Sequence, residues 1–128
     1  MDEHLFMKIV LVADDERNFR GVIRRLLETE REEVVIHEAV NGHEAIQMAR
    51  QLRPDLILLD LAMPDCNGLE AARRIRAEWA SARIVICSVH SQPAYRTAAL
   101  DSGADQFLLK KNLATQLPSL LHHYWAAS

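Results

Sequence analysis

Residues 56–59, Leu-Ile-Leu-Leu, form an unbroken apolar run that ends on Asp60. A strand with apolar residues on both faces is typical of a parallel sheet covered by helices on both sides, so this run predicts a central parallel strand. Two further apolar runs end on charged residues, the first on Asp14 and Asp15 and the last on Lys110. Because the carboxyl ends of parallel strands lie along one edge, three carboxylates and one ammonium are predicted to converge there.

Short apolar runs alternate with segments of helical period along the whole chain. The predicted strands cover residues 7–13, 34–36, 55–60, 83–88 and 106–109. The predicted helices cover residues 16–31, the segment between the Asn41-Gly42 turn and Pro54, the segment after Gly68, residues 93–102, and a last segment near the C-terminus. Five such alternations without hairpin turns predict one α/β domain with parallel strands, right-handed crossovers and helices on both faces.

The first predicted helix carries apolar residues at helical spacing, which indicates one buried stripe. The stripe comprises Phe19, Val22, Ile23, Leu26 and Leu27. The last helix has two alternative starts. With Thr115 as N-cap, Pro118 is the third helical residue and no donor is lost, whereas a start at Asn112 leaves one hydrogen bond unmade. We favour Thr115, and we place a left-handed cap at Gly103 after the fourth helix.

The composition fits a single globular domain. The chain has 128 residues, of which 49% are hydrophobic and 26% charged, and we assign residues 7–126 to the domain and 1–6 and 127–128 to tails. No apolar stretch approaches the roughly 20 residues of a membrane helix, and the N-terminus lacks the basic start of a signal peptide. We therefore expect a cytoplasmic protein without membrane contact.

Charge argues against a nucleic-acid-binding protein, and cysteine content argues against a cysteine-ligated metal site. A formal net charge of -3 and a pI near 6.0 argue against direct binding of nucleic acid by this chain. Cys66 and Cys87 are far apart and lack neighbours at metal-ligand spacing, so we predict two free thiols.

The acidic pair Asp14-Asp15, taken alone, fits an ordinary N-cap. A third carboxylate, Asp60, changes that interpretation, because two carboxylates 4 Å apart repel by roughly 4 kcal/mol at an effective dielectric near 20. A hard divalent cation, Mg²⁺ by preference, would relieve the repulsion. Lys110 and the Ser88 hydroxyl at the end of the fourth strand add donors for phosphoryl oxygens, so the set predicts phosphoryl transfer with Asp60 as nucleophile.

The chain resembles, from residue 8 to about residue 124, the receiver domain of bacterial two-component response regulators. The matching pieces are Val12-Ala13-Asp14-Asp15-Glu16, Ala39-Val40-Asn41-Gly42, Arg53-Pro54-Asp55 through Asp60, Met63-Pro64 with Gly68, Ser88, and Gly103-Ala104-Asp105 leading into Leu109-Lys110. The resemblance implies a flavodoxin-like doubly wound sheet of order 2-1-3-4-5, which places Asp15 beside Asp60.

Site roles follow from the resemblance. Asp60 would be the phosphoacceptor, Asp15 a direct Mg²⁺ ligand, Asp14 a ligand through water, and the backbone carbonyl of Ala62 a further ligand. The protein would signal by binding and would not turn over a small molecule.

The resemblance also implies a switch and partners. Ser88 and Lys110 would hold the phosphoryl group, and Ser88 would be coupled to Phe107, which has no hydroxyl and can respond only through packing. A sensor histidine kinase would be the phosphodonor, and a downstream effector or fused output domain the target. A homodimer would use helix 4, strand 5 and helix 5, with Tyr95, Arg96 and Leu117 as candidate surface residues.

Three positions depart from the family's usual pattern. Lys111 stands where a proline is usual, Val89 replaces a small residue, and Ala62 has no polar side chain to position water. We therefore expect slow phosphoryl turnover. His90 is expected to be a solvated loop residue.

Several alternatives remain at this stage. The chain could be the N-terminal receiver of a helix-turn-helix transcriptional regulator. A magnesium-dependent aspartyl phosphatase would usually carry a second Asp at the position of Ala62, and a flavin-binding module would not place Asp14-Asp15-Glu16 against a phosphate. A receiver-like scaffold that is never phosphorylated is the last alternative.

Overall fold

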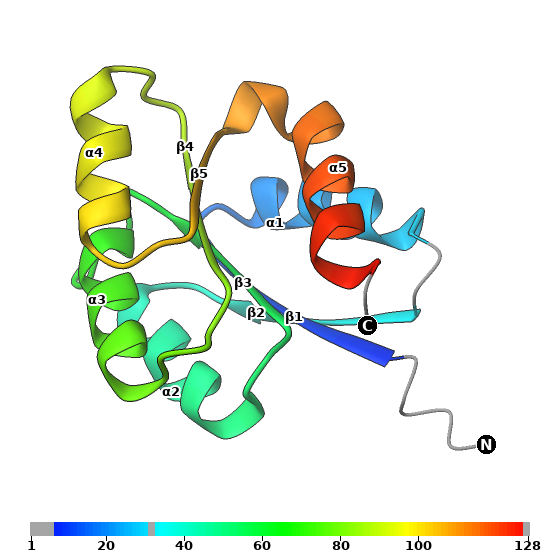
Figure 1. Ribbon diagram of the computed structural model, residues 1–128, viewed down its shortest axis with the longest axis horizontal. Coiled ribbons are helices and arrows are strands. Elements are labelled where there is room, and N and C mark those ends of the chain that lie inside the picture. Colours follow the sequence, from blue (N-terminus) through cyan, green and yellow to red (C-terminus); the bar gives the residue numbers. More distant parts are fainter. Residues whose placement is uncertain (1–6, 31–32, 127–128) are drawn as a thin grey trace.

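Five parallel strands form one sheet in the order β2-β1-β3-β4-β5 in the computed structural model (Figure 1). The strands are β1 (Met7–Ala13), β2 (Glu33–Ala39), β3 (Leu56–Asp60), β4 (Ile84–Ser88) and β5 (Gln106–Leu109). The structure describes residues 7–30 and 33–126, so the predicted tails lie outside the described part. The first helix ends at Glu28, so its predicted end at residue 31 was wrong. The predicted doubly wound α/β fold is confirmed.

Helices cover both faces of the sheet, as predicted for parallel strands. They are α1 (Arg17–Glu28), α2 (Gly42–Leu52), α3 (Gly68–Glu78), α4 (Pro93–Asp101) and α5 (Leu113–Trp125), with a 3-10 turn η2 (Lys110–Asn112) before α5. Figure 1 shows α1 and α5 on one face and α2, α3 and α4 on the other. None of the helices in the described segments is long and apolar enough to cross a membrane.

The central strand β3 is buried along its whole length. Leu56 and Leu58 face the core beneath α1 and α5, while Ile57 and Leu59 face the core beneath α2, α3 and α4. This alternation follows from the two-residue period of a strand. Burial of each such side chain is worth about 1.5 to 3 kcal/mol, so the apolar run both locates the strand and holds the two layers together.

Two strand boundaries differ from the prediction, one beside a side-chain hydrogen bond and one because of pairing with a neighbouring strand. The third strand begins at Leu56 and not at residue 55, because the Asp55 carboxylate accepts a hydrogen bond from the Ile9 N–H. The second strand extends over seven residues, although it contains His37 and Glu38, because it pairs with β1 along its full length. Ladder hydrogen bonds outweigh local propensity here.

The stripe predicted for α1 is correct at four of its five positions. Ile23 and Leu27 are buried, and Phe19 and Leu26 pack half-buried against the same core. Val22 is 40% exposed, so its assignment to the buried stripe was wrong. Its side chain lies at the edge of the apolar stripe and reaches solvent.

The predicted start of the last helix was also wrong. The helix begins at Leu113, directly after the 3-10 turn, and Pro118 is therefore its sixth residue. Leu113 is 1% exposed, so burial of this side chain draws the chain into the helix one turn early. One intrahelical hydrogen bond is absent as a consequence. Gly103 has the predicted left-handed conformation, with φ of 108°.

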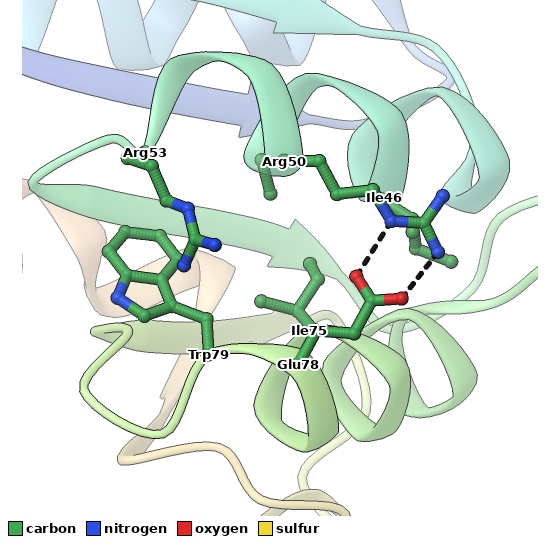
Figure 2. A pocket seen from close by; sticks show the side chains of 7 residues that line it. Ile46, Arg50, Arg53, Ile75, Glu78 and Trp79 are labelled. Atoms are coloured by element: carbon green, nitrogen blue, oxygen red, sulfur yellow. Dashed lines mark hydrogen bonds and ion pairs between the residues drawn. The ribbon is translucent and has the colours of Figure 1, made fainter.

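A small groove separates α2 from α3 on the face away from α1 (Figure 2). The Arg50 guanidinium forms two hydrogen bonds to the Glu78 carboxylate, of 2.7 and 2.6 Å, and the Arg53 guanidinium lies 5.0 Å from the Trp79 ring centroid. Beneath them Ile75 is buried. These contacts join the two helices. Elsewhere, both cysteines are free thiols, as predicted, and both are buried.

Candidate functional site

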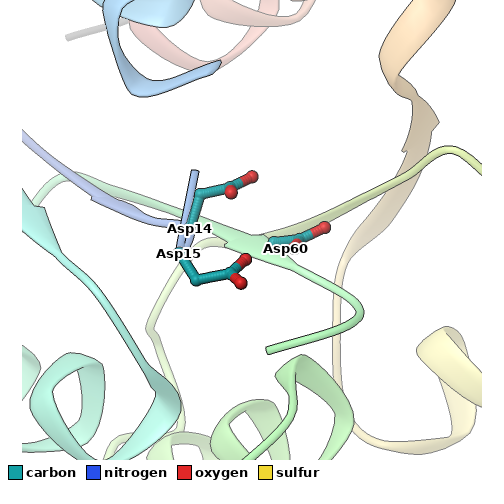
Figure 3. A group of neighbouring side chains, drawn as sticks. All are labelled: Asp14, Asp15 and Asp60. Atoms are coloured by element: carbon teal, nitrogen blue, oxygen red, sulfur yellow. The ribbon is translucent and has the colours of Figure 1, made fainter. Parts of the chain in front are cut away.

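Three carboxylates converge at the carboxyl edge of the sheet, as the sequence predicts. β1 and β3 are neighbours, with Ala13 opposite Leu59, so the residues that follow them lie side by side. One oxygen from each of Asp14, Asp15 and Asp60 lies within 4.8 Å of the others (Figure 3). A cluster of carboxylate oxygens at this spacing could hold a hard divalent cation.

Asp14 is fully buried and has two roles in the local structure. Its Oδ1 accepts a 2.8 Å hydrogen bond from the Glu16 N–H, directly before α1. Its Oδ2 accepts a 2.8 Å hydrogen bond from the Lys110 ammonium. The N-cap of α1 is Glu16 and has no side-chain cap hydrogen bond, so the capping interpretation of the acidic pair was wrong, whereas the contact with Lys110 fits the convergent-charge interpretation. Asp15, in contrast, is exposed.

The Lys110 ammonium supplies the counter-charge for this cluster. Its Nζ lies 2.8 Å from Asp14 Oδ2, 3.1 Å from Asp60 Oδ1 and 4.0 Å from the centre of the Phe19 ring. The lysine side chain is only 12% exposed. Phe19 was assigned to the core stripe of α1 from the sequence, and its proximity to a charged group 91 positions away depends on the tertiary fold.

Burial and neighbouring charges at this edge shift two pKa values. Burial and, next, the neighbouring charge of Asp14 raise the pKa of Asp60 to about 6, and the Lys110 charge offsets only part of that rise. Burial opposes the charge on Lys110, but its hydrogen bond to Asp14 and the charge of Asp60 outweigh this effect and raise the pKa of the ammonium. At neutral pH the site therefore contains an ionised Asp60 beside a protonated lysine.

Ser88 ends β4 at the same edge and is buried. Asp60 pairs with Cys87, and Ser88 pairs with Leu109, so Ser88 lies between the strand ends that carry Asp60 and Lys110. The Ser88 hydroxyl accepts a 2.9 Å hydrogen bond from the His90 N–H.

The prediction that His90 is a solvated loop residue was wrong. His90 is half-buried and stacks on Tyr95 of α4, with the ring centroids 4.8 Å apart.

Leu117, a predicted surface residue, is fully buried in the core beneath α5, because it faces the sheet.

Ala62 and Phe107 occupy contrasting environments. Ala62 is exposed in the loop after β3, two residues beyond Asp60. This loop is held by hydrogen bonds from the Leu61 N–H to the Cys87 carbonyl and from the Gly68 N–H to the Leu61 carbonyl. Phe107 is buried in β5, with the Arg96 guanidinium 5.2 Å from its ring centroid.

Arg20 is a further residue at the site that sequence reasoning did not identify. Its Nη1 donates a 2.7 Å hydrogen bond to the main-chain carbonyl of Asp14, and its Nε donates to Glu38 at 2.7 Å. Glu38 also accepts from Arg24, and these hydrogen bonds, with that of Arg24 the stronger influence, lower its pKa. Arg20 thus ties the acidic loop to both α1 and β2.

Comparison with known proteins gives consistent matches. A family model described as the response regulator receiver domain matches residues 10–122. The chain is 40% identical over 113 residues to the nitrate/nitrite response regulator protein NarL of Escherichia coli (strain K12), covering 88% of this chain and 52% of that protein. It is 34% identical over 103 residues to the chemotaxis protein CheY of Thermotoga maritima, covering 80% of this chain and 85% of that protein.

A solved structure is similar at the level of the whole domain. The two-component response regulator of the LuxR family from Aurantimonas sp. SI85-9A1 superimposes with a TM-score of 0.85 at 30% identity, covering 94% of this chain and 86% of that one. The chain spans about half the length of the NarL relative, which is therefore the longer protein.

Proposed function

The chain belongs to the response regulator receiver domains, and on that premise we propose that Asp60 accepts a phosphoryl group from a phosphohistidine of a sensor histidine kinase. One observation carries this proposal: three carboxylates and the Lys110 ammonium meet at one edge of the sheet, with Asp60 on the central strand. The same arrangement would be costly without a function, because like charges are brought together in a buried place.

Mg²⁺ is the proposed cofactor of the acidic cluster. The donor set fits this ion, since all the side-chain ligands are carboxylate oxygens and two of the three residues are buried. Asp15 and Asp60 would bind directly, Asp14 through water, and Ala62 through its carbonyl oxygen. Bound Mg²⁺ supplies positive charge that offsets the carboxylates and the phosphoryl oxygens.

The proposed reaction is a substitution at phosphorus. A carboxylate oxygen of Asp60 forms the new P–O bond while the P–N bond of the phosphohistidine breaks. The bonding electron pair stays on the imidazole nitrogen, which takes up a proton. Lys110 and the Ser88 hydroxyl would bind oxygens of the transferred group, so Lys110 has to exchange a carboxylate contact for a phosphoryl contact.

The proposed output is a change in partner binding. Ser88 at the site and Phe107 in the core beneath α4 would couple phosphorylation to the surface formed by α4, β5 and α5. A downstream effector or a fused output domain would bind there, or a second copy of the chain. We also propose a cytoplasmic location, as is general for response regulators.

Intact mass spectrometry tests the proposal. The protein is incubated with acetyl phosphate and Mg²⁺, and the wild type is expected to gain the mass of one phosphoryl group. Asp60→Asn should gain none, whereas Asp65→Asn, an exposed loop control, should react like the wild type. An adduct on both the wild type and Asp60→Asn, or on neither, would overturn the assignment.

A further inference from the structure

We propose that Phe19 is a positioning residue that keeps the Lys110 ammonium at the acidic site while the charges around it change. This inference rests on the proposed function of Asp60, and it assigns a role to an apolar side chain outside the charged cluster. Phe19 does not touch the reacting atoms in this account. It acts through Lys110 alone.

The contact itself is short and specific. Lys110 Nζ lies 4.0 Å from the centre of the Phe19 ring, on the face that carries the negative part of the ring quadrupole. Cation–π pairs within the described residues range from 4.0 to 5.9 Å, and this pair is the shortest of them. It is also the pair that involves a charged group of the site.

The three partners of the ammonium differ in how they respond to a bound cation. Asp14 and Asp60 are both proposed Mg²⁺ ligands, so their attraction for Lys110 weakens when a divalent charge is bound beside them. The Phe19 ring carries no net charge, and its attraction for the ammonium persists. Since a lysine stem has four flexible carbons, the ring is what restrains the ammonium until phosphoryl oxygens arrive.

The position of the ring is itself fixed by the fold. Phe19 lies in the first turns of α1, half-buried, and packs against the core shared by α1 and α5. The next residue, Arg20, binds the main-chain carbonyl of Asp14. The aromatic face and the acidic loop are therefore joined through the first turn of α1, so the ring places Lys110 beside Asp14.

The test compares Phe19→Leu and Phe19→Met, which keep apolar volume and remove the ring, with Phe19→Tyr, which restores it. Leu26→Ala serves as the matched control, because Leu26 packs half-buried from the same helix against the same core. Thermal unfolding establishes which variants are folded at the temperature of the assays.

The first measurement needs no phosphorylation. Nuclear magnetic resonance reports the shift of the Lys110 ε-methylene protons, which the ring current should move upfield in the wild type, with and without saturating Mg²⁺. The wild type, Phe19→Tyr and Leu26→Ala should keep the upfield shift in Mg²⁺, while Phe19→Leu and Phe19→Met, which lack the ring current, serve only as the reference for an unshifted methylene group. A wild-type shift that is solvent-like in Mg²⁺ would overturn the inference.

The second measurement is the rate of Asp60 phosphorylation by acetyl phosphate at saturating Mg²⁺. We expect a loss of about fivefold in Phe19→Leu, from the usual strength of a cation–π contact, and a near wild-type rate in Phe19→Tyr and Leu26→Ala. Equal rates in the wild type and Phe19→Leu overturn the positioning role. If the wild type is not phosphorylated at all, the proposed function fails, and the resonance shifts still decide whether Phe19 holds Lys110.

Discussion

The guanidinium of Arg20 donates a 2.7 Å hydrogen bond to the main-chain carbonyl oxygen of Asp14. Through this bond, α1 holds the turn that presents the acidic pair, and through Glu38 the same arginine is joined to β2. Lys110 binds the side chain of Asp14 from the opposite end of the chain. Asp14 is therefore held at both its backbone and its carboxylate.

Arg20→Ala should loosen the acidic turn. We expect a loss of about 2 kcal/mol in the free energy of unfolding, because two hydrogen bonds of a charged, largely buried group are removed. Affinity for Mg²⁺ should fall several-fold as well. Arg24→Ala is the matched control, since Arg24 binds Glu38 but is 43% exposed, and it should cost no more than about 1 kcal/mol. Urea denaturation and Mg²⁺ titration measure both effects, and equal effects in the two variants would contradict this account.

Asp60 should destabilise the metal-free fold above pH 6. Burial and the Asp14 charge raise its pKa from the ordinary value of 3.8 to about 6, so the folded state binds this proton more tightly than the unfolded state. Its contribution to stability is thus complete below pH 3.8 and is lost as the pH rises through 6. Asp60→Asn should therefore be more stable than the wild type by up to about 3 kcal/mol at pH 8.

The same comparison well below pH 3.8 should show little difference, because Asp60 is then protonated in both the folded and unfolded states. Urea denaturation of both proteins across this pH range, without divalent cations, is the measurement. A difference that is independent of pH would show that the carboxyl charge is not its cause.

Mg²⁺ should raise the melting temperature of the wild type, because a ligand that binds only the folded state stabilises it. Its affinity should fall as the pH drops below about 6, since protons then compete for Asp60. Asp15→Asn should abolish the effect of Mg²⁺ on melting, whereas Asp65→Asn should retain it. Scanning calorimetry at several Mg²⁺ concentrations decides between these outcomes, and an unaltered response in Asp15→Asn would rule out the proposed site.

Gly68 and Gly21 should respond in opposite ways to alanine. A Cβ at Gly68 would meet the main-chain carbonyl of Asp60, with the Leu61 Cα only 3.1 Å away. Gly68→Ala should therefore cost about 1 to 3 kcal/mol and weaken Mg²⁺ binding, because the loop after β3 has to move. No atom lies within 4 Å of a Cβ at Gly21, so Gly21→Ala should gain up to about 1 kcal/mol in helix stability. Chemical denaturation measures both changes, and a stabilised Gly68→Ala protein would contradict the described loop packing.

The phosphorylated protein should lose its phosphoryl group slowly. Ala62 is exposed beside Asp60 but has no polar atom to orient an attacking water molecule. Ala62→Asn should shorten the half-life several-fold, while Val89→Ala should have a smaller effect because Val89 is already 72% exposed to solvent. Phosphorus resonance after removal of the donor follows the decay, and a wild-type half-life as short as that of fast chemotaxis receivers would refute the expectation.

The strands and the acidic edge were predictable because their signals are local. The run that ends on Asp60 is apolar at every position, which indicates burial on both faces without knowledge of the neighbours. The positions of Asp14 and Lys110 at strand ends then follow from the parallel order. The start of α5 was not predictable in the same way, because burial of Leu113 outweighed the cost of Pro118 within the helix.

Hydrophobic periodicity along the chain was sufficient to establish the order of elements, the parallel sheet and the edge at which three carboxylates meet. It did not reveal that Phe19 covers the Lys110 ammonium or that Arg20 holds the Asp14 carbonyl. The physical reason is that the Phe19–Lys110 contact joins segments 91 positions apart, while the Arg20–Asp14 contact, although only six positions apart, depends on a side-chain rotamer selected by packing; hydrophobic periodicity reports neither. The tertiary structure alone specifies how the charges of this site are held.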